Sequence, residues 1–380
     1  MDFDLTQDQK MLADSAASFA RKTSPVTRMR RLRDDAIGYE RKVWKHMAEL
    51  GWLGLPFAET DGGLGGSMVD VMVLLEQLGS TLVPEPYLSS VLLGGMAIAR
   101  AGDAAQKQRW LAPMIAGDAT LALAYAERDG RYDLTCVTTR AESSGSGGSV
   151  KLSGEKIFVL GGHDADYFVV SARETSGFGL YVVDKGAAGL SLQPVKLMDG
   201  QRAAIVRFDG VEVDSARRLN VGGARAAETL EWVVDQAATA ACAEGLGIMQ
   251  AVLRMTVDYL RTREQFGVKI GTFQVLQHRA VDMFVEVELC RGTAMLAAIK
   301  ASDADPAARA AAVSAAKAQL GVGGKLVTQQ AIQLHGGIGV TDEHDVGLYF
   351  KRMCSLNTLF GDEEHHVRRF ASLPSFAADL

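Results

Sequence analysis

The spacing of apolar residues changes twice along this chain of 380 residues. From Asp2 to about Met114 they recur every three or four positions, as on one face of a helix. From about Leu121, short runs rich in β-branched and aromatic residues alternate with Ser-Gly, Gly-Gly and Asp-Gly turns, which is typical of strands. From about Ala224 the helical spacing resumes. The pattern predicts an α+β fold with an N-terminal helical domain over 1–117, a small middle β domain over 118–223 and a C-terminal helical bundle over 224–380.

The C-terminal region contains the clearest helix of the sequence. Its apolar residues step by three and four and form one stripe: Leu276, Ala280, Met283, Val287, Cys290 and Ala294. Such a stripe packs one helix against its neighbours, so we expect a four-helix bundle, interrupted at the segment DADPAAR, 303–309. In the β region, SSGSGGS, 143–149, is low in complexity and predicts a flexible hairpin tip or surface loop.

Charge and composition argue against several classes of function. The chain has 40 basic and 46 acidic residues, and no long basic run that could neutralise a nucleic-acid backbone. Its start, MDFDLTQDQK, does not resemble a secretory signal, and no apolar run approaches the roughly 20 residues that span a bilayer. We therefore expect a cytoplasmic protein without nucleic-acid binding or membrane insertion. Four scattered cysteines form no C-x-x-C pair and are interpreted as buried thiols: Cys136, Cys242, Cys290 and Cys354.

Two motifs marked by glycine lie in the C-terminal region. The first is YLRTREQFGVKIGTFQVLQH, Tyr259 to His278, where a helix ends and a second one begins. Arg263 beside the turn could grip a pyrophosphate, and Gln274 at the new helix start could hydrogen-bond a ring or a ribose. This stretch is typical of a nucleotide contact.

The second motif is AIQLHGGIGVTDEHDVGLYFKR, Ala331 to Arg352. Gly336, Gly337 and Gly339 end a helix here and would let a ligand approach the backbone closely, although a glycine cluster alone is more often a helix C-cap. Taken together on this helix, strand, helix plan, the two motifs resemble the acyl-CoA dehydrogenase family of flavoproteins, from about Leu5 to about Arg369.

The resemblance implies the fold, the cofactor and the reaction. It implies an enzyme with FAD between the β domain and the bundle, which removes a proton from the α-carbon and a hydride from the β-carbon of an acyl-CoA thioester. The product would be a trans-2-enoyl-CoA, and the electrons would pass to an electron-transfer flavoprotein. Because such families complete each FAD site across a subunit interface, the resemblance also implies a homo-oligomer or a heteromer with a related subunit.

The resemblance also assigns residues to the cofactor. Those implied to line the adenosine diphosphate part of FAD, in part that of a neighbouring subunit, are Arg263, Phe266, Gln274, Gln333, Gly336 and Gly337. Phe158, in KIFVLGG, matches the position at which the family usually places a tryptophan against the flavin ring.

The catalytic positions depart from the family pattern. The family's Thr-Glu-Pro-x-x-Gly-Ser-Asp motif is matched by AERDGRYD, 126–133, where Ala126 and Tyr132 replace the residues that supply hydroxyls to the flavin and the acyl-CoA. The glutamate that removes the α-proton is matched by Phe360. Some members carry it on the helix that opens the bundle, and that position is matched by Ala237. Neither side chain can accept a proton.

Two other carboxylates are candidates for the base. Asp362 could act if a desolvated pocket raised its pKa, but it could equally be a helix N-cap. Glu244 lies seven residues beyond Ala237 on the same helix face, about 10 Å further along. Phe360 would contribute only its backbone N–H, which in this family polarises the thioester oxygen together with a flavin ribityl hydroxyl.

The stretch LFGDEEHHVRRF also raises the question of a metal. Glu363 and His366 have the E-x-x-H spacing of di-iron carboxylate bundles, but such a site needs a second E-x-x-H, which the sequence lacks. Acidic residues in a first turn favour the helix dipole, so we expect a solvated helix start and no metal.

Three hypotheses of function follow. The first is a self-sufficient acyl-CoA dehydrogenase with an unusual base, and the second is the base-lacking FAD-binding subunit of a heteromeric one. The third is a flavin- or thioester-binding protein without dehydrogenase activity. Retention of Arg263, Gln274 and Gln333 argues against a chain that has lost its flavin.

Overall fold

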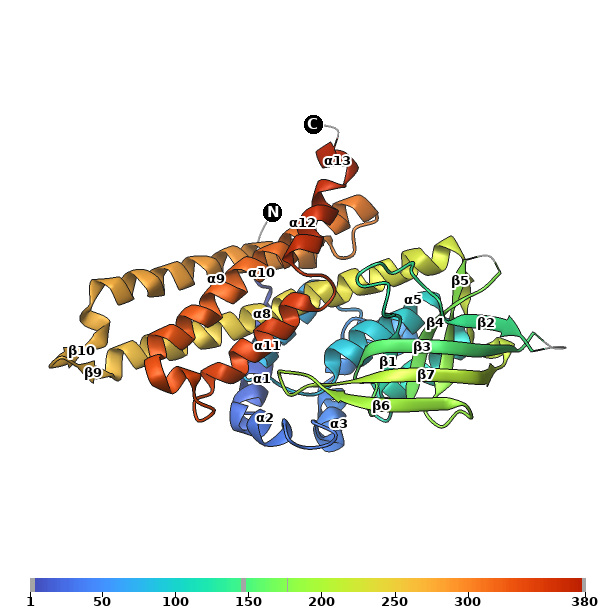
Figure 1. Cartoon of the computed structure of the whole chain (residues 1–380), viewed down its shortest axis with the longest axis horizontal. Coiled ribbons are helices and arrows are strands. Elements are labelled where there is room, and N and C mark those ends of the chain that lie inside the picture. The colour runs from blue at the N-terminus through green and yellow to red at the C-terminus, as the bar shows by residue number, and fades with distance from the viewer. Residues whose placement is uncertain (1–3, 145–147, 176, 378–380) are drawn as a thin grey trace. The chain divides into compact units, whose positions relative to one another are not determined.

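The computed structural model describes residues 4–144, 148–175 and 177–377. Contacts divide the chain into two compact units that alternate along the sequence. The first unit consists of Met1–Asp34, Ser67–Val83 and Ala238–Leu380, and the second of Asp35–Gly66 and Pro84–Ala237. Helices occupy the chain before β1 and after β8, and strands lie between them (Figure 1), so the predicted α+β class is confirmed. The domain boundaries at 117 and 223 stay a prediction.

The first unit is helical. Its helices are α1 (Gln7–Lys22), α2 (Val26–Leu32), α4 (Met68–Gly79), α9 (Gln274–Lys300), α10 (Pro306–His335), α11 (Val346–Thr358), α12 (Glu363–Ala371), α13 (Pro374–Ala377) and much of α8 (Ala224–Thr262). The turns η6 (Ile270–Thr272) and η7 (Gly336–Val340) and the hairpin of β9 (Glu264–Gln265) with β10 (Val268–Lys269) connect them. α10 packs against α9, α11 and α12, and α9 and α10 run side by side in Figure 1. The predicted interruption at 303–309 is confirmed.

Two helices of this unit cross at glycines. A Cβ on Gly79 of α4 would lie 2.3 Å from the carbonyl oxygen of Glu244, and one on Gly247 of α8 would lie 2.0 Å from that of Glu76. The Glu76 carboxylate accepts hydrogen bonds from Gln250 at 2.5 Å and from Arg291 at 3.1 Å. Any larger residue at either glycine would force α4 and α8 apart.

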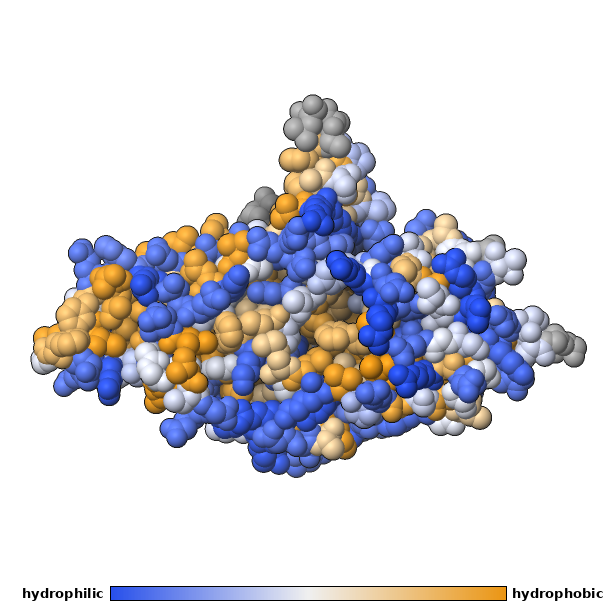
Figure 2. Space-filling view, viewed as in Figure 1, coloured by the Kyte–Doolittle hydropathy of each residue, from blue (hydrophilic) through white to orange (hydrophobic). Residues whose placement is uncertain are grey.

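α9 has two apolar faces. Four residues of the predicted stripe, Met283, Val287, Cys290 and Ala294, are buried, whereas Leu276 and Ala280 at its start are only partly buried. The opposite face also carries large apolar side chains, and these are exposed: Val281, Phe284, Val285, Leu289 and Leu296. Apolar residues are visible along this part of the surface in Figure 2. Exposed apolar faces of this extent are often sites of protein–protein contact.

The second unit is built on one mixed sheet, with strand order β6-β7-β3-β2-β4-β5-β8 and β1 beside β4. The strands are β1 (Leu121–Ala124), β2 (Arg140–Ser143), β3 (Val150–Leu160), β4 (Tyr167–Arg173), β5 (Phe178–Asp184), β6 (Leu190–Lys196), β7 (Arg202–Val213) and β8 (Arg218–Gly222). Leu152, Phe168 and Val206 are among the residues of its core. Each run that reads as a strand in the sequence forms one.

Short helices complete the second unit. They are α3 (Arg41–Glu49), η1 (Trp52–Gly54), η2 (Glu59–Asp61), η3 (Tyr87–Gly95), α5 (Met96–Ala101), α6 (Ala104–Gln106), η4 (Lys107–Leu111), α7 (Ala112–Ile115) and η5 (Ser215–Arg217). The predicted hairpin at 143–149 is supported by the pairing of Ser143 with Val150, whereas its tip, 145–147, lies outside the described residues.

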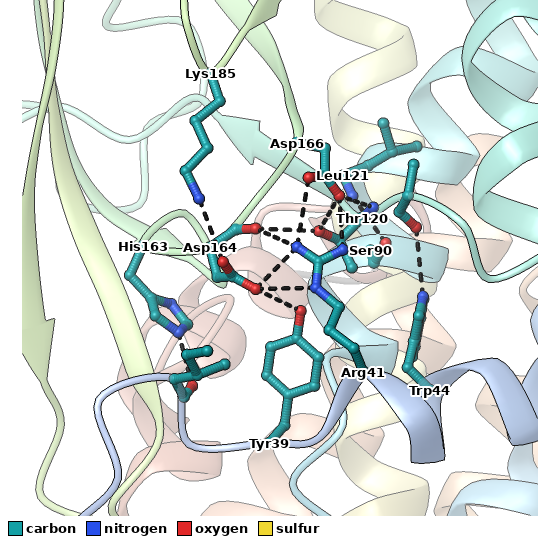
Figure 3. Close-up of polar contacts among 12 residues, drawn as sticks. Tyr39, Arg41, Trp44, Ser90, Thr120, Leu121, His163, Asp164, Asp166 and Lys185 are labelled. Atoms are coloured by element: carbon teal, nitrogen blue, oxygen red, sulfur yellow. Dashed lines mark hydrogen bonds and ion pairs between the residues drawn. The ribbon is translucent and has the colours of Figure 1, made fainter.

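A polar network fastens the segment before α3 to the turn between β3 and β4 (Figure 3). Arg41 donates to Asp164 at 2.9 Å and to Asp166 at 2.8 Å, and the Tyr39 hydroxyl donates to Asp164 at 2.8 Å. Asp166 also accepts the backbone N–H of Thr120 at 2.8 Å. Burial would raise the pKa of Asp164, but Tyr39 and Arg41 outweigh it and lower this pKa. Opposite charges therefore meet within the network, and it holds the two segments together.

Candidate functional site

A pocket of about 340 Å³ lies where α8 ends, α9 begins and α10 ends. It is lined by four of the predicted cofactor residues: Arg263, Gln333, Gly336 and Gly337. Its described lining does not include Phe266 or Gln274. Gln274 is nevertheless the first residue of α9, where the sequence placed it. The cofactor roles of these six residues stay predictions, but the fold brings four of them to one cavity.

The pocket begins where the backbone turns sharply after α8. The N–H of Arg263 donates to Tyr259 O at 2.9 Å, and the chain then enters the β9–β10 hairpin. The two residues at its tip both have left-handed backbones, Phe266 with φ 57° and Gly267 with φ 79°. This conformation matches the twist of a two-residue hairpin, but it is unusual for phenylalanine. The Phe266 side chain is 91% exposed.

Glycine is required on the opposite wall. Gly336, directly after α10, has φ 62°, which a side chain would strain. A Cβ on Gly336 or Gly337 would meet no described atom within 4 Å, so both glycines face open space. This is the arrangement expected where a ligand lies against the backbone.

An aromatic stack forms the floor of the pocket beside these glycines. The His335 ring lies 4.6 Å from the Tyr259 ring and 4.5 Å from the His344 ring, measured between centroids. His335 Nδ1 donates to Ala331 O at 2.7 Å, so Nε2 carries no proton. Burial lowers the pKa of His335 and keeps the ring neutral.

The pocket has a positive character. Arg263 forms no ion pair with any other described residue, and Arg279 contacts only the amide oxygen of Gln330, at 3.5 Å, among the printed polar contacts of that part of the chain. Guanidinium groups without a carboxylate partner, next to an open glycine backbone, suit a pyrophosphate. The donor set therefore fits the adenosine diphosphate half of FAD.

The sequence did not assign a cofactor role to the other residues that line this pocket. Tyr259, Arg279 and His335 line it but were not assigned a role. A signal existed for Tyr259, which precedes Arg263 by one helical turn and so shares its helix face. His335 could have been found as the last residue of α10, directly before the glycines.

In the second unit, Phe158 lies at an irregularity of β3. The register with β7 shifts between Lys156 and Val159, and Phe158 has φ 54°. Its side chain is 48% exposed, as expected for a ring that packs against a ligand. Contact with the flavin stays a prediction.

Two residues before Phe158 on β3, Lys156 forms a buried ion pair that anchors the loop 126–133. Lys156 Nζ donates to Glu127 at 2.7 Å and to Ser171 at 2.8 Å. Burial would raise the pKa of Glu127, but Lys156 and the hydrogen bonds from Thr138 and Thr139 outweigh it and hold this pKa at about 2. The ion pair thus holds the loop in place, although Ala126 and Tyr132 stand there where the family motif has threonine and serine.

Phe360, which the resemblance matches to the family's catalytic glutamate, lies in the turn between α11 and α12. Phe360 is buried, with φ 63°, and its carbonyl oxygen accepts His366 Nε2 at 3.0 Å. Ala237, at the alternative position, is also buried. Neither residue offers a proton acceptor on its side chain.

Both candidate substitute bases are occupied by other contacts. Glu244 accepts Arg352 Nε at 2.6 Å and Nη2 at 2.9 Å, a two-pronged ion pair in which each side chain is 11% exposed. Asp362 is the N-cap of α12 and accepts the N–H of His365 at 2.9 Å. These contacts hold both carboxylates in structural roles. Their assignment as bases stays a prediction with little geometric support.

The E-x-x-H pair is divided by the fold, since Glu363 is exposed and His366 is buried. No cluster of three or more histidine, cysteine, aspartate or glutamate side chains among the described residues could hold a metal ion. Within the same residues, no helix has the length and apolarity needed to cross a membrane.

Sequence profiles of known domains cover nearly the whole chain. Those of the acyl-CoA dehydrogenase N-terminal, middle and C-terminal domains match residues 6–118, 122–211 and 223–372. The chain belongs to the acyl-CoA dehydrogenase family. It is an FAD-dependent acyl-CoA dehydrogenase, an oxidoreductase acting on CH–CH donors, as the resemblance implied.

Individual relatives share this architecture over their full length. Acyl-CoA dehydrogenase IpdE2 of Mycolicibacterium smegmatis is 30% identical, over 96% of this chain and 98% of its own. A chain of the ChsE4–ChsE5 complex from Mycobacterium tuberculosis is 28% identical with a TM-score of 0.88, covering 98% of each chain. Butyryl-CoA dehydrogenase from Megasphaera elsdenii is 25% identical to the present chain with a TM-score of 0.90. The likeness covers 98% of the present chain and 99% of the butyryl-CoA dehydrogenase chain.

Proposed function

We propose that this acyl-CoA dehydrogenase is the base-lacking subunit of a heteromeric enzyme, and that a related subunit supplies the carboxylate that removes the α-proton. The observation that carries the proposal is the two-pronged pairing of Glu244 with Arg352. In this proposal the pairing keeps Glu244, the substitute base considered on α8, out of catalysis, while Phe360 and Ala237 match the family's base positions.

The pairing makes Glu244 a poor base for a physical reason. The guanidinium of Arg352 donates to both carboxylate oxygens of Glu244, so the lone pairs that face it are already in use. A general base also needs a free lone pair within hydrogen-bond reach of the proton it removes. Arg352 would have to move away before Glu244 could act, and this would break an ion pair between two side chains that are each only 11% exposed.

In the same proposal, the other residues assigned to the site bind FAD and orient the acyl-CoA. In this proposal Arg263, Gln333 and the glycines 336–337 hold the adenosine diphosphate half of FAD, and Phe158 packs against the flavin ring. FAD, when bound, accepts the hydride from the β-carbon. The N–H of Phe360 donates to the thioester oxygen of the acyl-CoA. Electron transfer to an electron-transfer flavoprotein and a cytoplasmic location belong to the same proposal.

Two observations support a second subunit. The exposed apolar face of α9 needs a cover, and it lies on the helix that Gln274 begins. The ChsE4–ChsE5 structure is a complex, and one of its chains is similar to this one over 98% of its length. A related subunit seated on α9 would cover the apolar face.

The proposal is tested by anaerobic stopped-flow bleaching of the flavin with acyl-CoA thioesters of short, long and steroid acyl groups. The wild-type chain alone should bleach slowly, because general-base catalysis contributes roughly 100- to 10,000-fold. Phe360→Glu should restore a rate gain of about that size, whereas Phe360→Gln, of the same shape without a base, should not. Addition of the related subunit should accelerate the wild type.

Asp362→Asn and Glu244→Gln complete the series. Rapid bleaching by the isolated wild type, lost in either variant, would replace the heteromer by a self-sufficient enzyme with that base. Rapid bleaching that survives both substitutions would reject the base-lacking subunit altogether.

A further inference from the structure

Side chains from α10 and α12 hold the Phe360 turn from behind. Lys317 Nζ on α10 donates to the carbonyl oxygen of Leu356 at 2.6 Å. His366 Nε2 on α12 contacts the carbonyl oxygen of Phe360 at 3.0 Å, and its Nδ1 lies 3.3 Å from the Ser314 hydroxyl. These contacts fix the main chain four residues before Phe360 and at Phe360 itself. All of them lie within the first unit.

The direction of each hydrogen bond follows from the chemistry of the groups. A carbonyl oxygen only accepts, so His366 Nε2 must carry the proton that points at Phe360. The other ring nitrogen then has a lone pair, which accepts the Ser314 hydroxyl. Burial, followed by the charge of Lys317, lowers the pKa of His366 to about 3, so the ring stays neutral with one donor and one acceptor.

Packing alone does not account for a lysine at position 317 of the bundle. Its side chain is fully buried, and burial lowers its pKa to about 8. A methionine of similar length would avoid the desolvation of an ammonium group. The acceptor of Lys317 lies in the last turn of α11, where carbonyls lack helical partners and the helix dipole is negative. Lys317 is thus a cap placed at the helix end that leads into the turn.

The backbone between these anchors is tightly constrained. The N–H of Leu359 donates to Ser355 O at 2.9 Å, and Phe360 then takes its left-handed conformation. A Cβ on Gly361 would lie 2.6 Å from His366 Nε2, so a larger residue would push the histidine off its acceptor. Within the described chain, the backbone hydrogen bonds outside helices and strands do not use the N–H of Phe360. This leaves that N–H as the available donor of a rigid turn.

We propose that Lys317, His366 and Ser314 are positioning residues that hold the Phe360 N–H in place as the donor to the thioester carbonyl oxygen of an acyl-CoA. The inference rests on the proposed function, in which this turn has no base. It explains why the turn is supported by buried polar groups after the glutamate has been lost. A fixed donor aimed at the oxygen needs no reorganisation when charge develops there.

The test measures polarisation of the bound thioester rather than turnover. An acyl-CoA labelled with ¹³C at the thioester carbonyl is bound to the holoenzyme, with the related subunit present. Its carbonyl stretch is then recorded by isotope-edited infrared spectroscopy under conditions in which the flavin is already reduced. The wild type should shift the band to lower frequency than in free acyl-CoA. Lys317→Met and His366→Leu should lose most of the shift, and Ser314→Ala should lose part of it.

His366→Gln is the control, because an amide N–H can replace Nε2–H at the Phe360 carbonyl. It should keep the shift, which a loss of general packing would not predict. FAD affinity, measured by fluorescence, should stay at the wild-type value in every variant, and Ser314→Ala carries the test if Lys317→Met does not fold. A wild-type band identical to that of free acyl-CoA, or an unchanged band in Lys317→Met and His366→Leu, would overturn the inference. The proposed function is judged separately, by the Phe360→Glu rates.

Discussion

Three phenylalanines of this chain have left-handed backbones: Phe158, Phe266 and Phe360. A bulky residue with φ between 54° and 63° is a conformational outlier, and such outliers persist only where the surrounding structure enforces them. All three were assigned to the flavin or to the catalytic turn by family resemblance. The sequence could indicate which phenylalanines matter, but it could not reveal their backbone, because a left-handed φ leaves no trace in composition or spacing when the residue is not glycine.

The first prediction at this scale concerns Arg263. Arg263→Ala would remove a charge-assisted contact to the pyrophosphate worth about 1.5–3 kcal/mol, so FAD affinity should fall at least about tenfold. Fluorescence titration of the apoprotein measures it. Arg261→Ala is a matched control, since Arg261 is exposed in the last turn of α8, two residues before Arg263, and does not line the pocket. Equal affinities for the two variants would defeat the assignment of Arg263.

A second prediction separates ligand contact from packing. A Cβ on Gly337 meets open space, so Gly337→Ala should leave the melting temperature of the apoprotein nearly unchanged while weakening FAD. A Cβ on Gly339 would lie 2.5 Å from Ile332 O, so Gly339→Ala should lower that melting temperature. Calorimetry of the apoproteins and FAD titration decide the matter. Full FAD affinity in Gly337→Ala would mean that the ligand does not approach this glycine.

At the scale of elements, the sequence predicted the helices and strands that bury one face. It did not predict the contacts between residues that are far apart in the chain. The stripe of α9 and the strands of the sheet were found because a buried face repeats along the chain. The Glu244–Arg352 pair joins residues 108 positions apart, and Arg41 reaches Asp164 across 123 positions. Such pairs have no periodicity, so the pairing of Glu244 with Arg352 could be recognised only in the folded structure.

The connection between α10 and α12 gives a prediction about acid stability. The unfolded chain should bind a proton at His366 near pH 6.5, whereas the folded chain binds it only near pH 3, because burial, Lys317, His365 and Arg369 oppose the charge. Stability from neutral His366 is therefore fully present above pH 6.5 and is lost as the pH falls toward 3. His366→Gln should reduce the slope of unfolding free energy against pH in this window by up to about 1.4 kcal/mol per pH unit.

Denaturant unfolding at a series of pH values measures this slope. Ser314→Ala is the control, since it removes the hydroxyl partner of His366 but leaves the titrating ring, and it should keep most of the wild-type slope. A slope in His366→Gln as steep as that of the wild type would show that another group is responsible for the acid sensitivity.

At the scale of the whole molecule, the chain alternates between its two compact units. The N-terminal domain that sequence profiles match at 6–118 contributes to both: Ser67–Val83 belongs to the first unit and Asp35–Gly66 to the second. Apolar periodicity could find the helices of this region. Apolar periodicity could not show which helix belongs to which unit. That depends on close contacts between helices, such as the approach of Gly79 to α8. A single glycine in a sequence does not indicate such a contact.

The exposed face of α9 gives the prediction at this scale. Val285→Asp would place a charge in the apolar stripe, so the purified protein should dissociate into smaller species. Light scattering after gel filtration measures the mass. Val367→Asp makes the same exchange at an exposed valine of α12, outside the stripe, and should leave the mass unchanged. A wild type that is monomeric on its own and with the related subunit would contradict the role given to this face.

The same stripe also bears on how the protein must be produced. A chain synthesised without a subunit that covers this face exposes Phe284, Val285 and Leu289 to the other proteins of the producing cell. Exposed apolar surface there recruits chaperones, proteases or other unassembled chains. The yield of folded protein then depends on the ratio in which the two chains are synthesised. Expression from one gene alone should drive much of the product into inclusion bodies, and joint expression with the covering subunit should bring it into the clarified lysate.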